Sequence, residues 1–280
     1  MRSGFKFKDK HSSFFGVTVK TKSRPIRPEA KVYTLDIPCR DGAYDFSEAN
    51  QAGREYFYDR TFVITISVCA DNIHTLQDRL SQLSSWLMGS GELIFDDMPN
   101  TVWYGRISDE IIYMPNHGGS SATFEVSMRV RPFGKCIFGT EGPVLDIEMM
   151  IDNTIPLALD ETMHYVVSGS GTIAVRNFGE RPLRPCIHIQ GANAVILKLD
   201  GKTLSFESKG ECIVDFEKQS VIAAGNNVEV SGEFFEFMPG KNLLYFENSG
   251  SGAVTIDVSY TPEFNYGVNL EAIDWGEDDA

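Results

Sequence analysis

Two residue pairs in the sequence carry side chains that could bind a metal or act on a glycosidic bond. Cys186 and His188 lie two residues apart in a predicted strand, so their side chains share a face. A structural zinc takes four ligands and a catalytic zinc takes three, and no third ligand lies nearby in the sequence. Asp96 and Asp97 are adjacent and point to opposite faces of an extended chain, whereas a glycosidase needs two convergent carboxyl groups. We therefore expect buried structural residues at the first pair and turn-forming carboxylates at the second.

Two glycine-containing stretches resemble nucleotide-binding loops, but neither has the context that such a loop needs. Gly169 to Ala174 fits G-x-G-x-x-A, yet a strand pattern follows it instead of a helix. Gly201-Lys202-Thr203 resembles the end of a phosphate loop, but Ile196 stands where that loop requires its first glycine. Asp200-Gly201 is instead a typical two-residue hairpin turn. The sequence therefore predicts no catalytic, cofactor-binding or metal-binding residues, and it predicts that the isolated histidines are surface or capping groups: His11, His74, His117 and His164.

The charge distribution limits the partners that the chain can bind. The 280 residues carry a net charge of −14, which disfavours a nucleic-acid grip because such a grip needs basic groups to displace phosphate counterions. Residues 1–40 hold ten Lys or Arg and three acidic residues, for a charge of +7, while the other 240 residues carry −21. A basic segment on an acidic body suits either a nucleic-acid tail or head-to-tail self-association. The alternating apolar residues from Phe5 to Val19 are typical of strands, so we favour self-association.

Composition indicates a folded protein made in a reducing compartment. Hydrophobic residues make up 42% and charged residues 23%, which is typical of a globular chain and argues against disorder. The longest mostly apolar stretch, Phe62 to Ala70, is shorter than the roughly 18 residues that a membrane-spanning helix needs. Five widely spaced cysteines form no C-x-x-C pair, and no secretory signal or glycosylation sequon is present. We expect reduced, buried thiols: Cys39, Cys69, Cys136, Cys186 and Cys212.

Hydrophobic periodicity predicts short strands through most of the chain and one helix. Apolar and polar residues alternate through Phe62–Val68 and Phe124–Val130, which is the period of half-buried strands, and 32–37, 92–95 and 102–113 are further strand candidates. From Asp71 to Gly89 the apolar residues recur at steps of three and four, which predicts an amphipathic helix over residues 71–88. We expect Asp71 or Asn72 to cap it, Gly89 to end it and Trp86 to anchor it in the core. Its predicted core stripe is Ile73, Leu76, Leu80, Leu83 and Leu87.

Glycine and proline clusters at 131–134 and 139–143 predict a domain boundary. After it, short strand candidates follow at a spacing of about 8 to 12 residues with turn signals between them and no helical period, which is typical of a β-sandwich. We therefore predict a mainly β fold with an N-terminal domain at 1–140 and a sandwich domain at 141–265. Residues 266–280 form an acidic tail, which we expect to be solvated with Trp275 as its only aromatic anchor.

The order of the motifs resembles the distal tail protein (Dit) family of long-tailed bacteriophages and prophages of Gram-positive bacteria, from about Phe5 to Phe264. In the N-terminal half the resemblance rests on Phe14-Phe15-Gly16, the run from Cys39 to Asp45, the helix end Trp86-Leu87 and the run from Gly91 to Asp97. In the C-terminal half it rests on the runs 175–179, 184–191, 213–216 and 237–242. The residues that we assign as its structural signature are Gly16, Asp41, Gly42, Tyr44, Trp86, Phe95, Asp96, Asp97, Asn177, Pro185, Gly191, Asp215, Pro239, Gly240 and Asn242.

The resemblance implies a fold and a structural role. It implies an N-terminal β-barrel-like domain with one helix, a C-terminal galectin-like sandwich and a homohexameric ring. The ring would join the tail tube protein to the tail-tip, tail-associated or receptor-binding proteins of the baseplate, without catalysis, cofactor, stable nucleic-acid binding or membrane insertion. The implied place is the virion tail tip, after synthesis in the cytoplasm of the host bacterium. Ring contacts are expected in residues 1–140, whose long strands have edges that a neighbour can extend.

Two other function classes stay open from the sequence. The first is a cell-wall carbohydrate-binding module of a phage or bacterial surface protein, since β-sandwiches often present aromatic platforms to sugars. The sequence has three Trp, and the set of His, Asn-x-Arg, Trp and Glu with which true galectins bind sugars is absent. The second is a glycoside hydrolase, because acidic residues far apart in the sequence can converge in space.

Overall fold

The computed structural model describes residues 4–50, 53–107, 109–115, 120–136, 164–250 and 252–267. These residues are mainly β, and α1 is the only α-helix among them, so the predicted fold class is confirmed. They form two compact units: the described residues up to Gly134 together with Asn265–Gly267, and those from Lys135 to Phe264. The predicted boundary at residues 140 and 141 lies outside the described residues, so the predicted domain limits stay a prediction.

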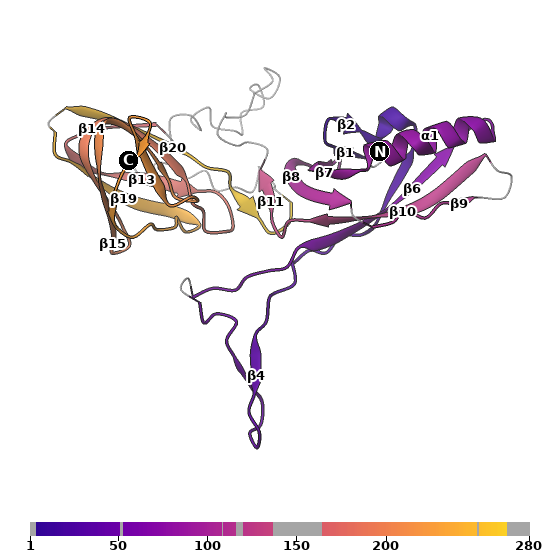
Figure 1. The fold of residues 1–280 in the computed structure, drawn as a ribbon, viewed down its shortest axis with the longest axis horizontal. Helices are drawn as coiled ribbons and strands as arrows, with labels where there is room; N and C mark the ends of the chain where they lie inside the picture. The colour runs from indigo at the N-terminus through magenta and orange to yellow at the C-terminus, as the bar shows by residue number, and fades with distance from the viewer. Residues whose placement is uncertain are drawn as a thin grey trace. The chain divides into compact units, whose positions relative to one another are not determined.

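The first unit is built on one antiparallel sheet (Figure 1). The strand order is β2-β1-β7-β8-β10-β6-β3, and β9 pairs with β10. Every second residue of the long strands is buried, as in Phe62, Ile64, Ile66 and Val68, because successive side chains of a strand point to opposite faces. The strands are β1 (Phe5–Phe7), β2 (Lys10–His11), β3 (Thr18–Ser23), β6 (Arg60–Cys69), β7 (Gly89–Phe95), β8 (Met98–Ile107), β9 (Met114–Pro115) and β10 (Ser121–Val130).

Two strand predictions in this unit need correction. The strand predicted at 102–113 ends at Ile107 in β8, since Asp109 and Glu110 are poor strand residues. The alternation predicted from Phe5 to Val19 is interrupted by a 3-10 helix, η1 (Ser12–Phe15). The chain turns there because the His11 ring accepts a hydrogen bond from the Ser13 amide, 3.2 Å away. Local capping therefore overrides the strand pattern, and His11 is the capping group that the sequence predicted.

The helix α1 (Ile73–Trp86) packs one face onto the core of the first unit. Asn72, one of the two predicted caps, accepts a hydrogen bond from the Thr75 amide at 3.0 Å. The capping residue at the other end is Leu87, and Gly89 has a φ of +80° but opens β7. Ile73 was expected in the core stripe and is 50% exposed, because a helical side chain leans over the turn before it and Ile73 is the first helical residue. The buried members of the helix face are Leu76, Leu83, Trp86 and Leu87, with Leu80 partly buried.

The second unit is a sandwich of antiparallel strands around a separate core. β14 pairs with β20 through residues 186–190 and with β19 through residues 195–198, so one long strand serves both layers. The pairing of β14 with β15 shifts register between Gln190 and Ala194, next to Gly191, which has a φ of +88°. The strands of the sandwich are β12 (His164–Ser168), β13 (Ser170–Asn177), β14 (Cys186–Leu199), β15 (Lys202–Asp215), β16 (Ser220–Ala223), β17 (Asn226–Asn227), β18 (Val230–Gly232), β19 (Gly240–Asn248) and β20 (Ala253–Ser259). Two short strands, β11 (Gly134–Cys136) and β21 (Glu263–Phe264), pair with each other and are not part of that sheet.

The hairpin predicted at Asp200-Gly201 is confirmed. The two residues have φ values of +48° and +80° and connect β14 to β15 through the pair Leu199 and Lys202. Positive φ at both central residues is the requirement of a type I′ turn, whose twist matches that of the flanking strands. Gly201-Lys202-Thr203 is therefore a turn and the start of a strand, and it is not a phosphate loop.

Candidate assembly surface

Residues 25–59 leave the sheet of the first unit and form a two-stranded ribbon, which we call the arm (Figure 1). Its end is the hairpin of β4 (Thr34–Asp36) and β5 (Ala43–Asp45), which pair only with each other. Nearer the sheet, the Lys31 amide donates to the Tyr56 carbonyl at 2.7 Å. Pro25 and Pro28 begin the arm and lack the amide hydrogens that would continue a ladder to the neighbouring strand. The arm is therefore built from its own hydrogen bonds.

The arm exposes an unusual amount of apolar surface. A two-stranded ribbon has no core, so its apolar side chains stay in contact with solvent. Ile26 is 73% exposed and Val32 is 60% exposed. The other exposed large apolar residues of the arm are Tyr33, Leu35, Ile37, Tyr44, Phe46, Tyr56 and Tyr58. So many exposed large apolar side chains in one segment are typical of an interaction site.

Basic side chains lie over several aromatic rings of the arm. The Arg40 guanidinium lies 3.7 Å from the centre of the Tyr44 ring, and the Lys31 ammonium lies 5.4 Å from that of Tyr58. Such contacts hold flexible cations in place and fix the rings that they cover. Several of the aromatic side chains on the arm are thereby partly ordered before any partner arrives.

Arg60 fixes the start of β6 where the arm returns to the sheet. Its side chain is 2% exposed, and one nitrogen donates to the carbonyls of Pro25 at 3.1 Å and Ile26 at 2.9 Å. Another nitrogen donates to the Asn265 carbonyl, and the guanidinium lies 5.1 Å from the centre of the Trp103 ring. Burial lowers the pKa of Arg60 to about 10. The side chain stays charged near neutral pH and ties three backbone segments together.

Arg24 makes a second link at the same end of the arm. It forms an ion pair with Asp97, and its Nε donates to the Tyr266 hydroxyl at 2.9 Å. Its guanidinium lies 4.7 Å from the centre of the Phe95 ring. The hydrogen bond from Arg24 lowers the pKa of Asp97, and the opposite charge of Arg24 acts in the same direction. Residues 265 and 266 are thus held by Arg60 and Arg24.

The basic residues of the N-terminal segment do not form a tail. Lys20 and Lys22 lie on β3, the last strand of the sheet order, and Lys22 pairs with Glu125 at 2.7 Å. Lysines on an edge strand discourage uncontrolled pairing with other chains. The described basic residues of this segment therefore lie on the sheet, at the point where the chain leaves it, and on the arm.

The N-terminal signature residues divide between the arm and the core. Asp41, Gly42 and Tyr44 lie at the end of the arm, where Gly42 has a φ of +75°. The others stabilise the fold. Gly16 (φ +63°) ends η1, Trp86 donates to the Phe7 carbonyl at 3.1 Å, and Phe95 is buried. Asp96 accepts a hydrogen bond from the Gly4 amide at 2.7 Å and lies 2.9 Å from the His11 ring. Asp96 and Asp97 lie in the turn between β7 and β8, as predicted, and each is bound to a different basic group. The two carboxyl groups therefore do not converge on one site, as the cleavage of a glycosidic bond would require.

The C-terminal signature residues stabilise turns of the second unit. Asn177 is 2% exposed; its Nδ2 donates to the carbonyls of Arg181 and Phe237. Asn242 accepts from the Met238 amide and donates to the Met238 carbonyl. The rest have similar roles: Pro185 accepts from the Phe216 amide, Gly191 (φ +88°) bends β14, Asp215 accepts from Lys218, and Pro239-Gly240 leads into β19. Their status as a family signature stays a prediction.

The remaining chemistry-bearing residues also have local partners. His188 contacts Glu211 at 2.8 Å, while burial raises the pKa of the nearby Cys186 thiol. Among the described residues no group of three or more His, Cys, Asp or Glu side chains is arranged to hold a metal. All five cysteines are free thiols, but contrary to expectation Cys39 and Cys69 are exposed, at the arm end and on the outer face of β6. Cys186 and His188 were expected to be buried and are only partly buried, because they alternate with Ile187 and Ile189, which face the core. His74 is exposed, His164 pairs with Asp257, and His117 lies outside the described residues.

The chain is similar to phage tail proteins in part of its sequence and in its fold. Residues 10–130 match the family model of the phage tail protein RIFT-related domain. No curated protein sequence is significantly similar to the chain. A solved structure, the Dit protein of phage SPP1, described as a paradigm of the hub adsorption apparatus of phages that infect Gram-positive bacteria, matches with a TM-score of 0.63 and 16% identity over 94% of this chain and 99% of that chain. A chain of the phage P2 baseplate in its activated conformation is more distant, with a TM-score of 0.41 and 6% identity over 95% and 100% of the two chains.

Proposed function

We propose that this protein, whose residues 10–130 belong to the phage tail RIFT-related domain family and whose chain has the Dit fold, is the distal tail hub of a long-tailed bacteriophage. A hub needs surfaces for its own copies and for the proteins on either side of it. The observation that carries the proposal is the arm, which exposes large apolar side chains but has no core to bury them in. Its role is structural rather than catalytic, and its place is the tail of the virion.

We assign the contacts between copies to the first unit. The arm can lie on the neighbouring copy and remove its apolar residues from water, which is the main favourable term in protein association. A head-to-tail contact of this kind closes only when copies are arranged in a ring, and otherwise it continues into a filament. We propose a ring of six, in which the second unit is displayed at the periphery, with the tail tube protein and the tail-tip or receptor-binding proteins as neighbours.

The alternative function as a carbohydrate-binding module has less support. A sugar platform needs an aromatic ring open to solvent, but Trp86 is 7% exposed, Trp103 is fully buried, and the exposed aromatic rings of the described residues lie in the first unit and not in the sandwich. Both rings pack in the core of the first unit. Trp275 lies outside the described residues.

The ring proposal is tested by charge insertion on the arm. In negative-stain micrographs and light scattering, the full-length protein should form rings, and Leu35→Lys should abolish them because it places a charge on the apolar surface of the arm. Val166→Lys is the matched control, since Val166 is 65% exposed on β12 of the second unit. Rings that persist in Leu35→Lys and disappear in Val166→Lys would assign assembly to the second unit.

A further inference from the structure

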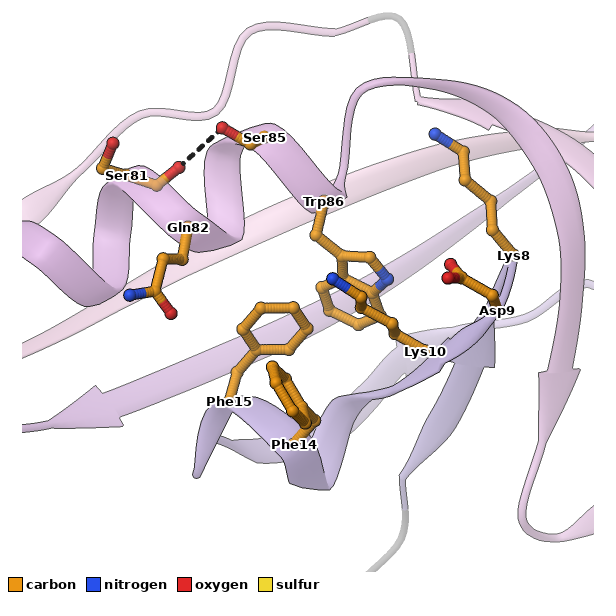
Figure 2. A pocket seen from close by; sticks show the side chains of 9 residues that line it. All are labelled: Lys8, Asp9, Lys10, Phe14, Phe15, Ser81, Gln82, Ser85 and Trp86. Carbon is orange, nitrogen blue, oxygen red and sulfur yellow. Dashed lines mark hydrogen bonds between the residues drawn. The ribbon is translucent and has the colours of Figure 1, made fainter.

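An open pocket of about 520 Å³ lies between η1 and α1, away from the arm (Figure 2). Its apolar lining is aromatic, from Phe14, Phe15 and Trp86, and its polar lining includes Lys8 and Lys10. Figure 2 shows the two phenylalanines rising from η1 toward Trp86 on the helix. Neither the family match nor the arm gives this pocket an occupant.

The aromatic rings form a stack that starts in the core and ends in solvent. Trp86 stacks on Phe5 with ring centres 5.2 Å apart and on Phe15 with ring centres 4.6 Å apart. Phe14 packs edge-on against Phe15 at 5.2 Å, and it is 71% exposed. The hydrogen bond from the Trp86 ring to the Phe7 carbonyl fixes the stack. The pocket therefore offers a wall of stacked aromatic rings beside polar groups, with room for one more aromatic ring.

The charges at the pocket favour an acidic ligand. The Lys10 ammonium lies 5.5 Å from the centre of the Phe14 ring, and no described acidic side chain forms an ion pair with it. Lys8 donates to the Met88 carbonyl and so holds its charge near the pocket. Asp9 is the one carboxylate of the lining, which leaves the pocket with a net positive charge. A ligand with an aromatic ring and several carboxylates fits this combination.

The end of this sequence has that composition. Residues 268–280 contain five acidic residues, no basic residue and one aromatic residue, Trp275. Trp275 follows Asp274 directly and stands two residues before Glu277. An indole in the pocket would thus bring carboxylates within reach of the lysines. We propose that Trp275 and the acidic residues around it dock into the pocket of their own chain.

The chain is long enough to reach. Gly267 lies beside Met98, which pairs with Phe95 at the turn between β7 and β8. Phe95 also pairs with Phe5 of β1, and Lys8 follows three residues later. Two strand spacings of about 5 Å and roughly 10 Å along β1 make a path of roughly 20 Å. The eight residues from 268 to 275 span up to roughly 26 Å when extended. The tail can therefore cross from Gly267 to the pocket within the first unit.

The proposal is independent of the hub function, and zero-length cross-linking tests it on the full-length protein. A carbodiimide joins a lysine to a carboxylate only when they are in contact, and mass spectrometry identifies the linked peptides. We expect links from Lys8 or Lys10 to Glu277, Asp278 or Asp279. The ion pair of Lys22 and Glu125, at 2.7 Å, is the internal standard for yield. An equal mixture of unlabelled and ¹⁵N-labelled protein distinguishes links within a chain from links between chains.

Variants separate docking from simple charge attraction. Trp275→Ala and Phe14→Ala keep every charge, and each should lower the tail links by about threefold to tenfold, as expected for the loss of one aromatic contact. Tyr44→Ala, which removes an exposed aromatic ring on the arm, should leave the yield unchanged. The proposal is overturned if tail links are absent while Lys22 and Glu125 are linked, or if both aromatic variants keep the full yield. Links of mixed isotope composition would overturn it in favour of the tail of a second copy.

Discussion

Removal of the Arg60 side chain should unfold the part of the arm nearest the sheet and lower the stability of the whole first unit. Arg60 is buried and donates to the carbonyls of Pro25, Ile26 and Asn265. Arg60→Ala removes a donor from each of these carbonyls, although it also removes the cost of burying a charge, which the lowered pKa of about 10 reflects. A buried carbonyl that loses its hydrogen-bond donor costs about 1 to 3 kcal/mol, and we expect a loss of unfolding free energy in that range. Arg60→Lys keeps the charge without the fork of donors, so it should cost about half as much.

Trp fluorescence during urea unfolding measures this loss selectively. Trp86 and Trp103 both lie in the core of the first unit, so a Trp275→Phe background leaves only reporters of that unit. Arg129→Ala is the matched control, since its pair with Asp59 at 3.0 Å is solvent-exposed and contributes less than about 1 kcal/mol. An exposed ion pair contributes at most roughly 1 kcal/mol. If the unfolding free energies of Arg60→Ala and Arg129→Ala differ by less than this roughly 1 kcal/mol, the hydrogen bonds from Arg60 to the three carbonyls do not stabilise the first unit. Hydrogen exchange at the arm amides should rise in the same variant.

Three further predictions concern other parts of the fold. Leu83→Ala should cost about 2 to 5 kcal/mol by urea unfolding because Leu83 is 1% exposed, and Leu80→Ala, at a partly buried position, should cost less; equal losses would contradict this packing. The pKa of Asp97 is lowered in the folded state, so ionised Asp97 stabilises the fold above the unfolded pKa of about 3.9, and this stabilisation is lost as pH falls through the folded pKa. In a pH series, the melting temperature of Asp97→Asn should therefore fall less in acid than that of the wild type. Gly232→Ala should lower the melting temperature more than Gly201→Ala. Both glycines have a positive φ, but only at Gly232 would a Cβ meet the backbone, 2.0 Å from the Thr203 carbonyl oxygen. Similar losses in the two variants would mean that the strand relaxes.

Local sequence signals predicted those elements whose cause is local. The helix, its Asn72 cap and the Asp200-Gly201 turn each depend on neighbouring residues, and all three are confirmed. Phe14 shows where such reasoning fails, because the alternation around it is typical of a strand while the cap at His11 and the left-handed Gly16 turn the chain into η1. Residue types alone did not predict that Phe14 is exposed.

The candidate assembly surface was only partly predictable. The strand candidate at 32–37 overlaps β4, and Pro25 and Pro28 are a sequence signal that the chain leaves the sheet there. That Arg60 is buried could not be predicted, since its acceptors at residues 25, 26 and 265 come together only in the folded chain. Partners 205 residues apart in sequence leave no local pattern.

The return of residues 265–267 to the first unit makes the second unit an insertion within the chain of the first. The insertion enters through β11 and leaves through β21, and these two short strands pair with each other, with the Cys136 amide donating to the Pro262 carbonyl at 3.1 Å. Its entry and exit are therefore adjacent, about one strand spacing apart. Recombination at these two points could exchange or delete the second unit as a whole. After a deletion, a short turn between β11 and β21 would be enough to close the chain of the first unit.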